Sequence, residues 1–280
     1  MNSGAQTARE GPLVLADTGE RMVPEFSGRP TFWEHVYRYA FATRFVRGKR
    51  VLDIACGEGY GAAALQKAGA ANVIGVDIAE DVCLHAQNRY GLDVRLGNGE
   101  NIPLANESVE VVVSFETIEH VPDPHRFLEE CVRVLAPGGR LIISTPNRDV
   151  YARAGVARNP YHCSEMTKEE FASALRPRFH DLRFYTQGPH AAAWWSARAL
   201  VCEDTPWNRL PGFWRMRRAF QHKFVPEATK DPTDEQRGFI LQLILQVARR
   251  PHQLLSPFAL RAERGWTGEK PTYIIATGIH

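Results

Sequence analysis

The chain has 280 residues, of which 44% are hydrophobic and 24% charged, and its formal net charge is +2. This size suits one large α/β domain with an insertion or two small domains, and the near-neutral charge argues against a dedicated nucleic-acid binder. The scattered cysteines lack a CxxC pair, the N-terminus lacks the apolar core of a signal peptide, and no apolar run is long enough to span a bilayer, so we expect a soluble cytoplasmic protein without a transmembrane segment.

Strand and helix patterns alternate along most of the chain. Residues 1–30 are rich in Gly, Pro and polar residues and are expected to form an arm, and residues 31–47 have helical spacing. The expected strands are then 50–54, 72–76, 93–96, 109–115, 139–144 and 179–186, with helices at 61–68, 80–90, 124–135 and 168–175. This alternation predicts a doubly wound, mostly parallel sheet covered on both faces.

A long helical segment separates the sixth expected strand from the last one at 272–278. Its expected helices are 191–201, 208–222 and 233–248. We therefore divide the chain into an arm (1–30), a core (31–188), an inserted helical cap (189–268) and a final core strand (269–280). The apolar run 238–248 is too short to cross a membrane; it could dock on one, but a buried helix or a homodimer interface is the simpler interpretation.

The run Val51-Leu-Asp-Ile-Ala-Cys-Gly-Glu-Gly-Tyr-Gly61 reads as a buried strand, a glycine turn and the start of a helix. Gly57, Gly59 and Gly61 let the backbone come close to a ligand, because no Cβ blocks the approach. A turn at the carboxyl end of a strand is where open α/β sheets bind nucleotide-like ligands. The carboxylate of Asp53 would repel a pyrophosphate and attract a cationic amino-acid group, which favours S-adenosylmethionine (SAM) over a dinucleotide.

Four further segments place polar residues at strand ends in the same way: Val73–Asp77, Leu96–Leu104, Val111–His120 and Leu135–Asn147. Together with the glycine turn they resemble the class I SAM-dependent methyltransferases of the type 11-like group, over roughly residues 17–186. The resemblance implies a Rossmann-like α/β fold, SAM as the methyl donor, and a small molecule or glycan as the acceptor.

The resemblance also implies roles for individual residues. Asp53 would reach the ammonium group of SAM directly or through water, and Asp77 would bind the ribose. Asn98 stands where the family usually has an Asp that accepts from the adenine amino group, and Ala55 replaces the family's first glycine. The full set of expected SAM-binding residues is Asp53, Ala55, Gly57, Gly59, Asp77, Ile78, Asn98, Gly99, Glu100, Ser114 and Phe115.

The candidates for catalysis follow the fourth strand and the fifth strand. Glu116, Glu119 and His120 share a face if their turn is helical, and His120 could act as a general base, order the loop, or bind a divalent metal with the two glutamates. His162, in the segment 159–165, rivals His120 as a base. We expect no metal, and take Glu116, Glu119, Tyr161 and His35 as acceptor-binding candidates. His35 lies on the first helix with Glu34, Tyr37 and Arg38, for which an exposed polar face is the simpler interpretation.

Several functions remain open at this stage. The segment Thr18–Pro24 and the helix after it are similar to methyltransferases found with sugar-modifying enzymes, which favours methylation of an O or N atom of a sugar-containing metabolite. The run Glu119–Pro124 also occurs in quinone and phenolic O-methyltransferases, which is the first alternative. A loose Gly57-x-Gly59-x-x-Ala62 pattern with Asp77 leaves an NAD-dependent oxidoreductase as an alternative of another class, and the changes at Ala55 and Asn98 leave a non-catalytic scaffold.

Overall fold

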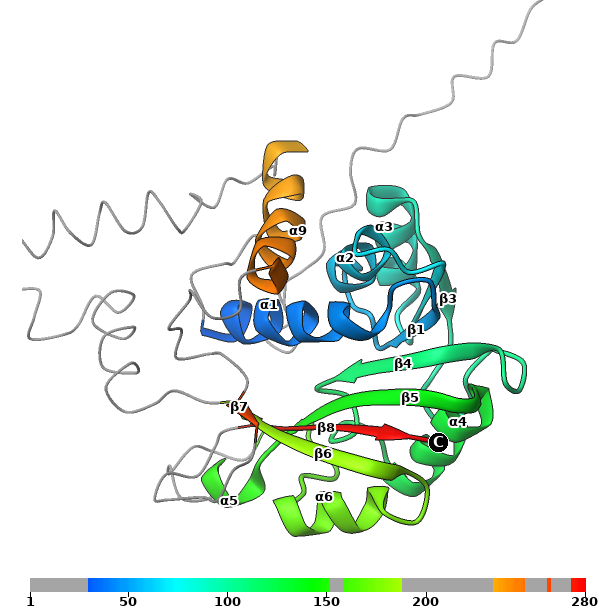
Figure 1. Ribbon diagram of the computed structural model, residues 1–280, viewed down its shortest axis with the longest axis vertical. Coiled ribbons are helices and arrows are strands. Elements are labelled where there is room, and N and C mark those ends of the chain that lie inside the picture. The colour runs from blue at the N-terminus through cyan, green and yellow to red at the C-terminus, as the bar shows by residue number, and fades with distance from the viewer. Residues whose placement is uncertain (1–29, 152–158, 188–233, 250–260, 263–272) are drawn as a thin grey trace, which may run out of the picture.

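A computed structural model describes residues 30–151, 159–187, 234–249, 261–262 and 273–280 of the chain (Figure 1). The arm and most of the predicted cap lie outside these residues, so the division into domains stays a prediction. The described strands are β1 (Arg50–Ile54), β2 (Asn72–Asp77), β3 (Asp93–Leu96), β4 (Val109–Phe115), β5 (Leu135–Pro146), β6 (His180–Gln187), β7 (Arg261–Ala262) and β8 (Tyr273–Ile279). The described helices are α1 (Pro30–Ala42), the 3-10 turn η2 (Thr43–Phe45), α2 (Tyr60–Lys67), α3 (Glu80–Tyr90), α4 (Pro124–Val134), α5 (Arg148–Tyr151), α6 (Lys168–Leu175) and α9 (Asp234–Arg249).

All eight strands belong to one sheet, in the order β3-β2-β1-β4-β5-β8-β6-β7. The neighbours from β3 to β5 are parallel, whereas β8 runs antiparallel to both β5 and β6. The predicted mostly parallel, doubly wound sheet is therefore confirmed. The short strand β7 was not predicted, because the sequence suggested only helices there; it pairs with Tyr185 and Thr186 of β6 and covers part of an open edge.

Helices cover the sheet on both faces, and β1 shows how its residues divide between them. Val51 belongs to a hydrophobic cluster with α1, α2 and α9, whereas Leu52 and Ile54 belong to a second cluster with α4 and α6. Figure 1 shows the two groups of helices on opposite sides of the sheet. Successive side chains of a strand point to opposite faces, so Asp53 faces the same side as Val51 and is buried there beneath α1.

Two glycines of the first turn make room for helices. A Cβ on Gly61 would lie 2.0 Å from Cζ of Tyr39 on α1, and a Cβ on Gly59 would lie 2.7 Å from Cβ of Ala86 on α3. Gly59 also has a φ of 93°, in the left-handed region that favours glycine. The space that these two glycines leave is filled by the neighbouring helices, and the approach of their backbone to a ligand stays a prediction. Gly57 has no such neighbour within 4 Å.

Glu34, Tyr37 and Arg38 of α1 are buried and His35 is partly buried, which corrects the expectation of an exposed polar face. The helix ends at Ala42, shorter than predicted, and Arg38 is fully buried, with Glu34 only 5% exposed. Nε of Arg38 donates to Oε1 of Gln187 at 2.7 Å, and the guanidinium stacks over the ring of Tyr273 at 4.2 Å. Both partners belong to strands far away in the sequence, so the helical period alone could not show that this face is covered.

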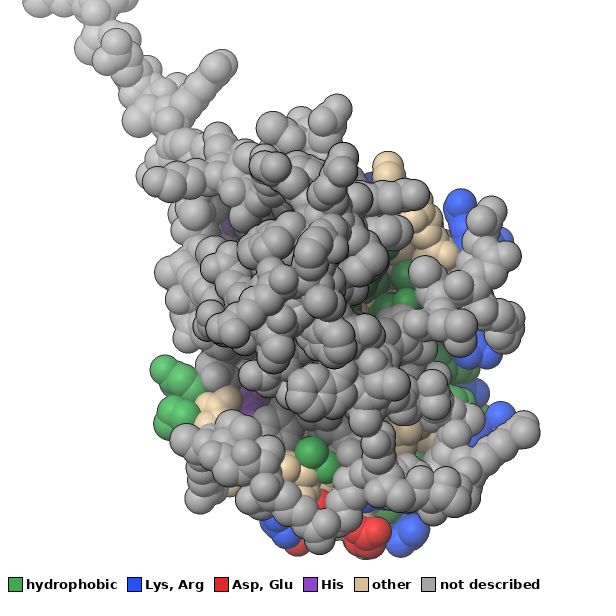
Figure 2. Space-filling view, turned by 90° about the vertical axis from the view of Figure 1, so that its left-hand side faces the viewer, with side chains coloured by type: hydrophobic (Ala, Val, Ile, Leu, Met, Phe, Trp, Pro, Cys, Tyr) green, Lys and Arg blue, Asp and Glu red, His purple; other side chains and the backbone are tan. Residues whose placement is uncertain are grey.

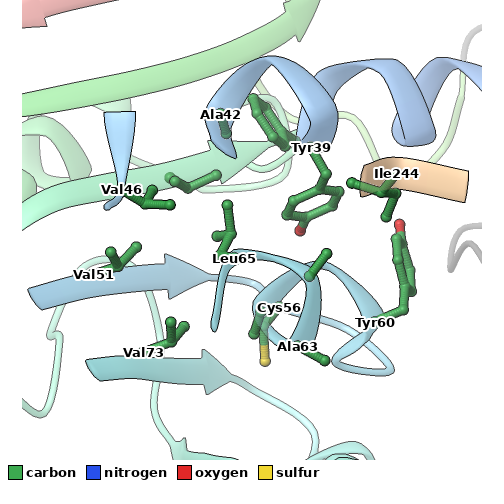
Figure 3. Close-up of a cluster of buried hydrophobic side chains, with 14 of the residues drawn as sticks. Tyr39, Ala42, Val46, Val51, Cys56, Tyr60, Ala63, Leu65, Val73 and Ile244 are labelled. Carbon is green, nitrogen blue, oxygen red and sulfur yellow. The ribbon is translucent and has the colours of Figure 1, made fainter. Parts of the chain in front are cut away.

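Helix α9 contributes to the core, although it comes from the predicted insertion. Leu241, Ile244 and Val247 are buried in the cluster of α1 and α2, as the buried-helix interpretation predicted (Figure 3). The homodimer interface stays a prediction. None of the helices that the structure describes has the length and apolar character that a bilayer crossing requires.

The described surface carries charges of both signs. On the face in Figure 2, Lys and Arg side chains spread along one edge, with Asp and Glu beside them at the lower end. Ion pairs such as Arg148–Glu170, at 2.7 Å, combine the two kinds of charge. This mixture agrees with the small net charge of +2.

Candidate functional site

A cavity of about 500 Å³ lies at the carboxyl ends of the parallel strands. Eight of the predicted SAM-binding residues line it, namely Ala55, Gly57, Asp77, Ile78, Asn98, Gly99, Glu100 and Phe115, together with the predicted His35, Glu116 and His120. The wall does not include Asp53, Gly59, Ser114, Glu119, Tyr161 or His162. The lining residues that sequence reasoning missed are Tyr39, Ile54, Cys56, Tyr60, Gly97, Thr117, Val121 and Pro122.

Asp77 holds the glycine turn in place. Its Oδ2 accepts from the backbone N–H of Gly57 at 2.9 Å, and its Oδ1 accepts from that of Ala79 at 3.1 Å. An ionised carboxylate offers about four lone-pair sites, so Asp77 retains capacity for two hydroxyl donors of a ribose. The turn itself is built from left-handed residues, with φ of 57° at Ala55 and 54° at Gly57.

Asp53 lies behind the cavity wall, next to Tyr39. The Tyr39 hydroxyl, on a residue that lines the cavity, donates to both carboxylate oxygens of Asp53 at 3.2 Å. Burial raises the pKa of Asp53 to about 8, with a smaller rise from Asp77, although the hydrogen bond from Tyr39 acts in the opposite direction. Desolvation therefore favours the neutral carboxyl, and a cation near this position would favour the carboxylate.

Another part of the cavity wall offers polar groups and one apolar side chain to a ligand. Oδ1 of Asn98 accepts from the backbone N–H of Glu100 at 2.9 Å, which fixes the side chain. Oε1 of Glu100 accepts from the backbone N–H of Asp123 at 3.0 Å. Ile78 is 75% exposed although it is a large apolar residue, and in a cavity such a side chain offers a surface for a flat ring.

Aromatic side chains from α1, α2 and β4 form another part of the wall. The ring of Tyr39 meets those of Phe115 and Tyr60 edge to face, with centroids 5.1 and 5.5 Å apart. The Tyr60 hydroxyl lies 2.8 Å from Nδ1 of His35. Burial, with Arg38 nearby, holds the pKa of His35 well below its usual value, so this imidazole is neutral.

The turn after β4 contributes Glu116 and Glu119. Glu116 adopts a φ of 54°, and its Oε1 accepts from the Ser144 hydroxyl at 2.7 Å and lies 3.4 Å from Nη1 of Arg38. Glu119 is buried, and its Oε2 accepts from the Thr145 hydroxyl at 3.2 Å. Burial and then Glu116 raise the pKa of Glu119 well above its usual value. A non-glycine residue held at positive φ is common at functional sites.

The segment 159–165 docks on this turn and brings the second histidine to the first. The backbone N–H groups of Cys163 and Ser164 donate to the carbonyl of Glu119 at 2.8 and 3.0 Å. The rings of His120 and His162 then meet edge to face, with centroids 4.8 Å apart. Tyr161 is 58% exposed.

A parallel sheet of this order, with a glycine turn after its first strand and an acid at the end of its second, defines a Rossmann-like protein that binds nucleotide-like ligands. Residues 52–143 match the family model of the methyltransferase domain. The chain is 39% identical over 168 residues to a probable S-adenosylmethionine-dependent methyltransferase of Mycolicibacterium smegmatis. The matched region is 59% of this chain and 65% of the relative. A ubiquinone biosynthesis O-methyltransferase of Parvibaculum lavamentivorans is 37% identical over 120 residues, or 41% of this chain and 47% of that one.

Solved structures show the same fold. A SAM-dependent methyltransferase of Thermotoga maritima, described as a possible histamine N-methyltransferase, matches with a TM-score of 0.55 and 17% identity over 88% of both chains. The cyclase SpnF matches with a TM-score of 0.50 and 17% identity, over 89% of this chain and 80% of its own. Residues 52–143 therefore match a methyltransferase domain, within a fold that SAM-dependent methyltransferases share, and SAM is the methyl donor that this match implies. The matches cover less than two thirds of the curated relatives' length, and the cyclase shows that the fold alone does not define the reaction.

Proposed function

We propose that this protein transfers a methyl group from SAM to an oxygen or nitrogen atom of a small molecule or glycan. One observation carries the proposal: a single cavity joins the glycine turn and Asp77 to Glu116 and His120. The first pair suits the donor, and the second pair provides the kind of groups that position and deprotonate an acceptor. The remaining acceptor capacity of Asp77 and the apolar surface of Ile78 fit the ribose and the adenine ring of SAM.

Methyl transfer is a displacement at carbon that needs collinear reactants more than strong acids or bases. The acceptor's lone pair forms the new bond to the methyl carbon, and the carbon–sulfur bond breaks with its electron pair going to sulfur, which leaves S-adenosylhomocysteine. If the acceptor atom is a hydroxyl oxygen, its proton passes to a base. His120 is the candidate base, because it lines the cavity and histidine is the side chain that most often serves as a general base.

For the acceptor we propose a sugar-containing metabolite, with a quinone or phenol as the second candidate. The sugar proposal rests on the segment Thr18–Pro24, which lies outside the described residues. The second candidate is favoured by the similarity to the ubiquinone biosynthesis O-methyltransferase. Incubation with methyl-labelled SAM and fractionated extracts separates the two, because the label enters either a glycan or sugar fraction or a quinone and phenol fraction.

Calorimetry with SAM tests the donor assignment. We expect saturable binding in the micromolar range, and at least about a tenfold loss of affinity in Asp77→Asn, since one strong acceptor for the ribose is lost. Asp93→Asn is the matched control, because Asp93 is exposed at the start of the neighbouring strand β3. Absence of binding at millimolar SAM, or equal affinities of both variants, would disprove the proposal.

A titration with NADH tests the oxidoreductase alternative. We expect no change in NADH fluorescence, because the carboxyl of Asp53 behind the glycine turn suits a cationic amino-acid group and offers nothing to a pyrophosphate. Saturable NADH binding that SAM does not displace would favour the oxidoreductase instead.

A further inference from the structure

Glu119, His120 and His162 form a cluster that the proposed methyl transfer leaves partly unexplained. One ligand atom from each of these residues lies within 4.8 Å of the other two. Two of the residues belong to the turn after β4, and the third belongs to the segment docked on it through the Glu119 carbonyl. Only His120 lines the cavity, so the cluster stands at the cavity wall.

Hydrogen bonds orient both imidazoles. Nδ1 of His162 lies 2.6 Å from Oε1 of Glu165, and Nδ1 of His120 lies 3.2 Å from the carbonyl oxygen of Tyr161. Both oxygens accept, so each Nδ1 carries a proton and the neutral ring has its lone pair on Nε2. An imidazole whose other nitrogen donates to a carboxylate or a carbonyl is the usual arrangement of a histidine that binds a metal ion.

The carboxylate of Glu119 completes the cluster. Its side chain is 1% exposed, and while Oε2 accepts from Thr145, Oε1 has no hydrogen-bond partner. Oε1 lies 4.0 Å from Nε2 of His120. A buried carboxylate oxygen without a partner is costly, and a cation between Glu119 and the two imidazoles would remove this cost. A role for His120 as a base alone gives no account of this oxygen.

We propose that Glu119, His120 and His162 bind a first-row divalent cation such as Zn²⁺ or Mn²⁺. Two imidazoles and one carboxylate are a ligand set that leaves coordination positions open for other molecules. Bonds of about 2.1 Å would hold the three ligand atoms roughly 3 to 3.5 Å apart, so they need to approach by about 1 Å through side-chain rotation. The sequence led us to expect no metal. The metal site considered there consisted of Glu116, Glu119 and His120, and the site proposed from the structure has His162 in place of Glu116.

The role of the ion rests on the proposed function. With the ion on Nε2 of His120, this imidazole has no lone pair left to act as the base. The ion would instead bind an acceptor oxygen at the cavity wall and lower the pKa of its hydroxyl, so that the proton is lost to solvent before methyl transfer. This assigns an acceptor with a hydroxyl group that binds the metal, and favours vicinal oxygens because two of them can occupy two open positions. An amine acceptor would not need the ion.

Direct metal binding tests the inference. Untagged full-length protein is treated with a chelator, dialysed and titrated with Zn²⁺ and Mn²⁺ by calorimetry, and Co²⁺ is added as a visible-absorption probe of nitrogen ligation. We expect one ion per chain with a Kd in the micromolar range or below for Zn²⁺. The affinity should fall at least about 100-fold in His162→Ala and roughly 10- to 100-fold in Glu165→Gln, which removes only the charge that orients His162.

The control variant is His180→Ala, because His180 is exposed at the start of β6, and its affinity for Zn²⁺ should equal that of the unchanged protein. SAM affinity, measured on the same samples, reports that each variant is folded. Absence of stoichiometric binding at millimolar Zn²⁺ and Mn²⁺, or equal affinities of His162→Ala and His180→Ala, would overturn the inference. If SAM still binds in that case, the proposed function stands without the metal; if SAM does not bind either, the proposed function fails as well.

Discussion

Asp53 occupies a position that an apolar residue would fill more easily. It lies on a strand buried on both faces, and its neighbours Leu52 and Ile54 point into the opposite cluster. Its pKa of about 8 lies above the ordinary 3.8, so the folded protein keeps a proton that the unfolded chain releases between these values. Stability therefore falls as pH rises from about 4 to about 8. Because this buried acid lowers the stability of the fold near neutral pH, we expect it to take part in ligand binding.

Binding of SAM should remove this proton from Asp53. At pH 6.5 the ligand's amino group is charged and most of Asp53 is protonated, and an ammonium group acting on the carboxylate, directly, through Tyr39 or through water, favours the ionised form. We expect release approaching one proton per SAM, measured from binding enthalpies in buffers of different ionisation enthalpy. The release should disappear in Asp53→Asn and persist in the exposed control Asp93→Asn. An enthalpy that is the same in all buffers would contradict this role.

At Ala55 the backbone adopts a left-handed conformation that suits glycine better than alanine. Its φ of 57° costs an L-residue about 1–2 kcal/mol; glycine would relieve this strain, but its larger unfolded-state entropy would cancel part of the gain. We expect Ala55→Gly to raise the free energy of unfolding by about 0.5–1 kcal/mol in urea titrations and to leave SAM affinity unchanged. Ala68→Gly is the control, because its φ is −75°, and it should lose a few tenths of a kcal/mol. Equal losses in the two variants would show that Ala55 is not strained.

At the scale of elements, α1 is attached to the sheet by polar contacts as well as by its apolar face. Arg38 contacts Gln187 of β6 and Glu116 of the β4 turn, and no other buried cation compensates Glu116 among the ion pairs that the structure describes. Removing one partner of a buried pair leaves a charge without compensation, which costs more than the pair itself contributes.

We expect Arg38→Met to lower the free energy of unfolding by about 3–5 kcal/mol. The double variant Arg38→Met/Glu116→Gln should recover part of this loss, because it removes the charge that the single change leaves behind. Chemical denaturation measures both, with Arg47→Met as the control because Arg47 is exposed just beyond the helix. A loss below about 1 kcal/mol for Arg38→Met would mean that water reaches Glu116.

The sequence predicted the site residues at strand ends, but it did not predict those that packing between distant segments brings to the site. Asp77 and Phe115 are the last residues of their strands and Asn98 comes two residues after β3, so a local pattern was enough to bring them to one edge of the sheet. Tyr39 reaches the cavity because Gly61 leaves space for its ring, and His162 reaches His120 because a distant loop donates hydrogen bonds to Glu119. Contacts of this kind depend on tertiary packing, and no periodicity in the sequence reports them.

At the scale of the whole molecule, α9, which belongs to the predicted cap, packs against residues that line the cavity. Figure 3 shows Ile244 beside Tyr39 and Tyr60, and all three are buried in one cluster. The two tyrosines also line the cavity. A segment that lies far away in the sequence therefore packs against residues that form the wall of the cavity.

Truncation of Ile244 should affect stability and ligand binding together. Ile244 is fully buried, so Ile244→Ala is expected to cost about 2–5 kcal/mol in the free energy of unfolding, from lost apolar contacts and the cavity left behind. The neighbouring tyrosines gain freedom, and SAM affinity measured by calorimetry should fall a few-fold. Gln242→Ala, on the exposed face of the same helix, should stay within about 0.5 kcal/mol and bind SAM normally. A variant of Ile244 that loses stability but keeps full SAM affinity would show that α9 holds the core without shaping the site.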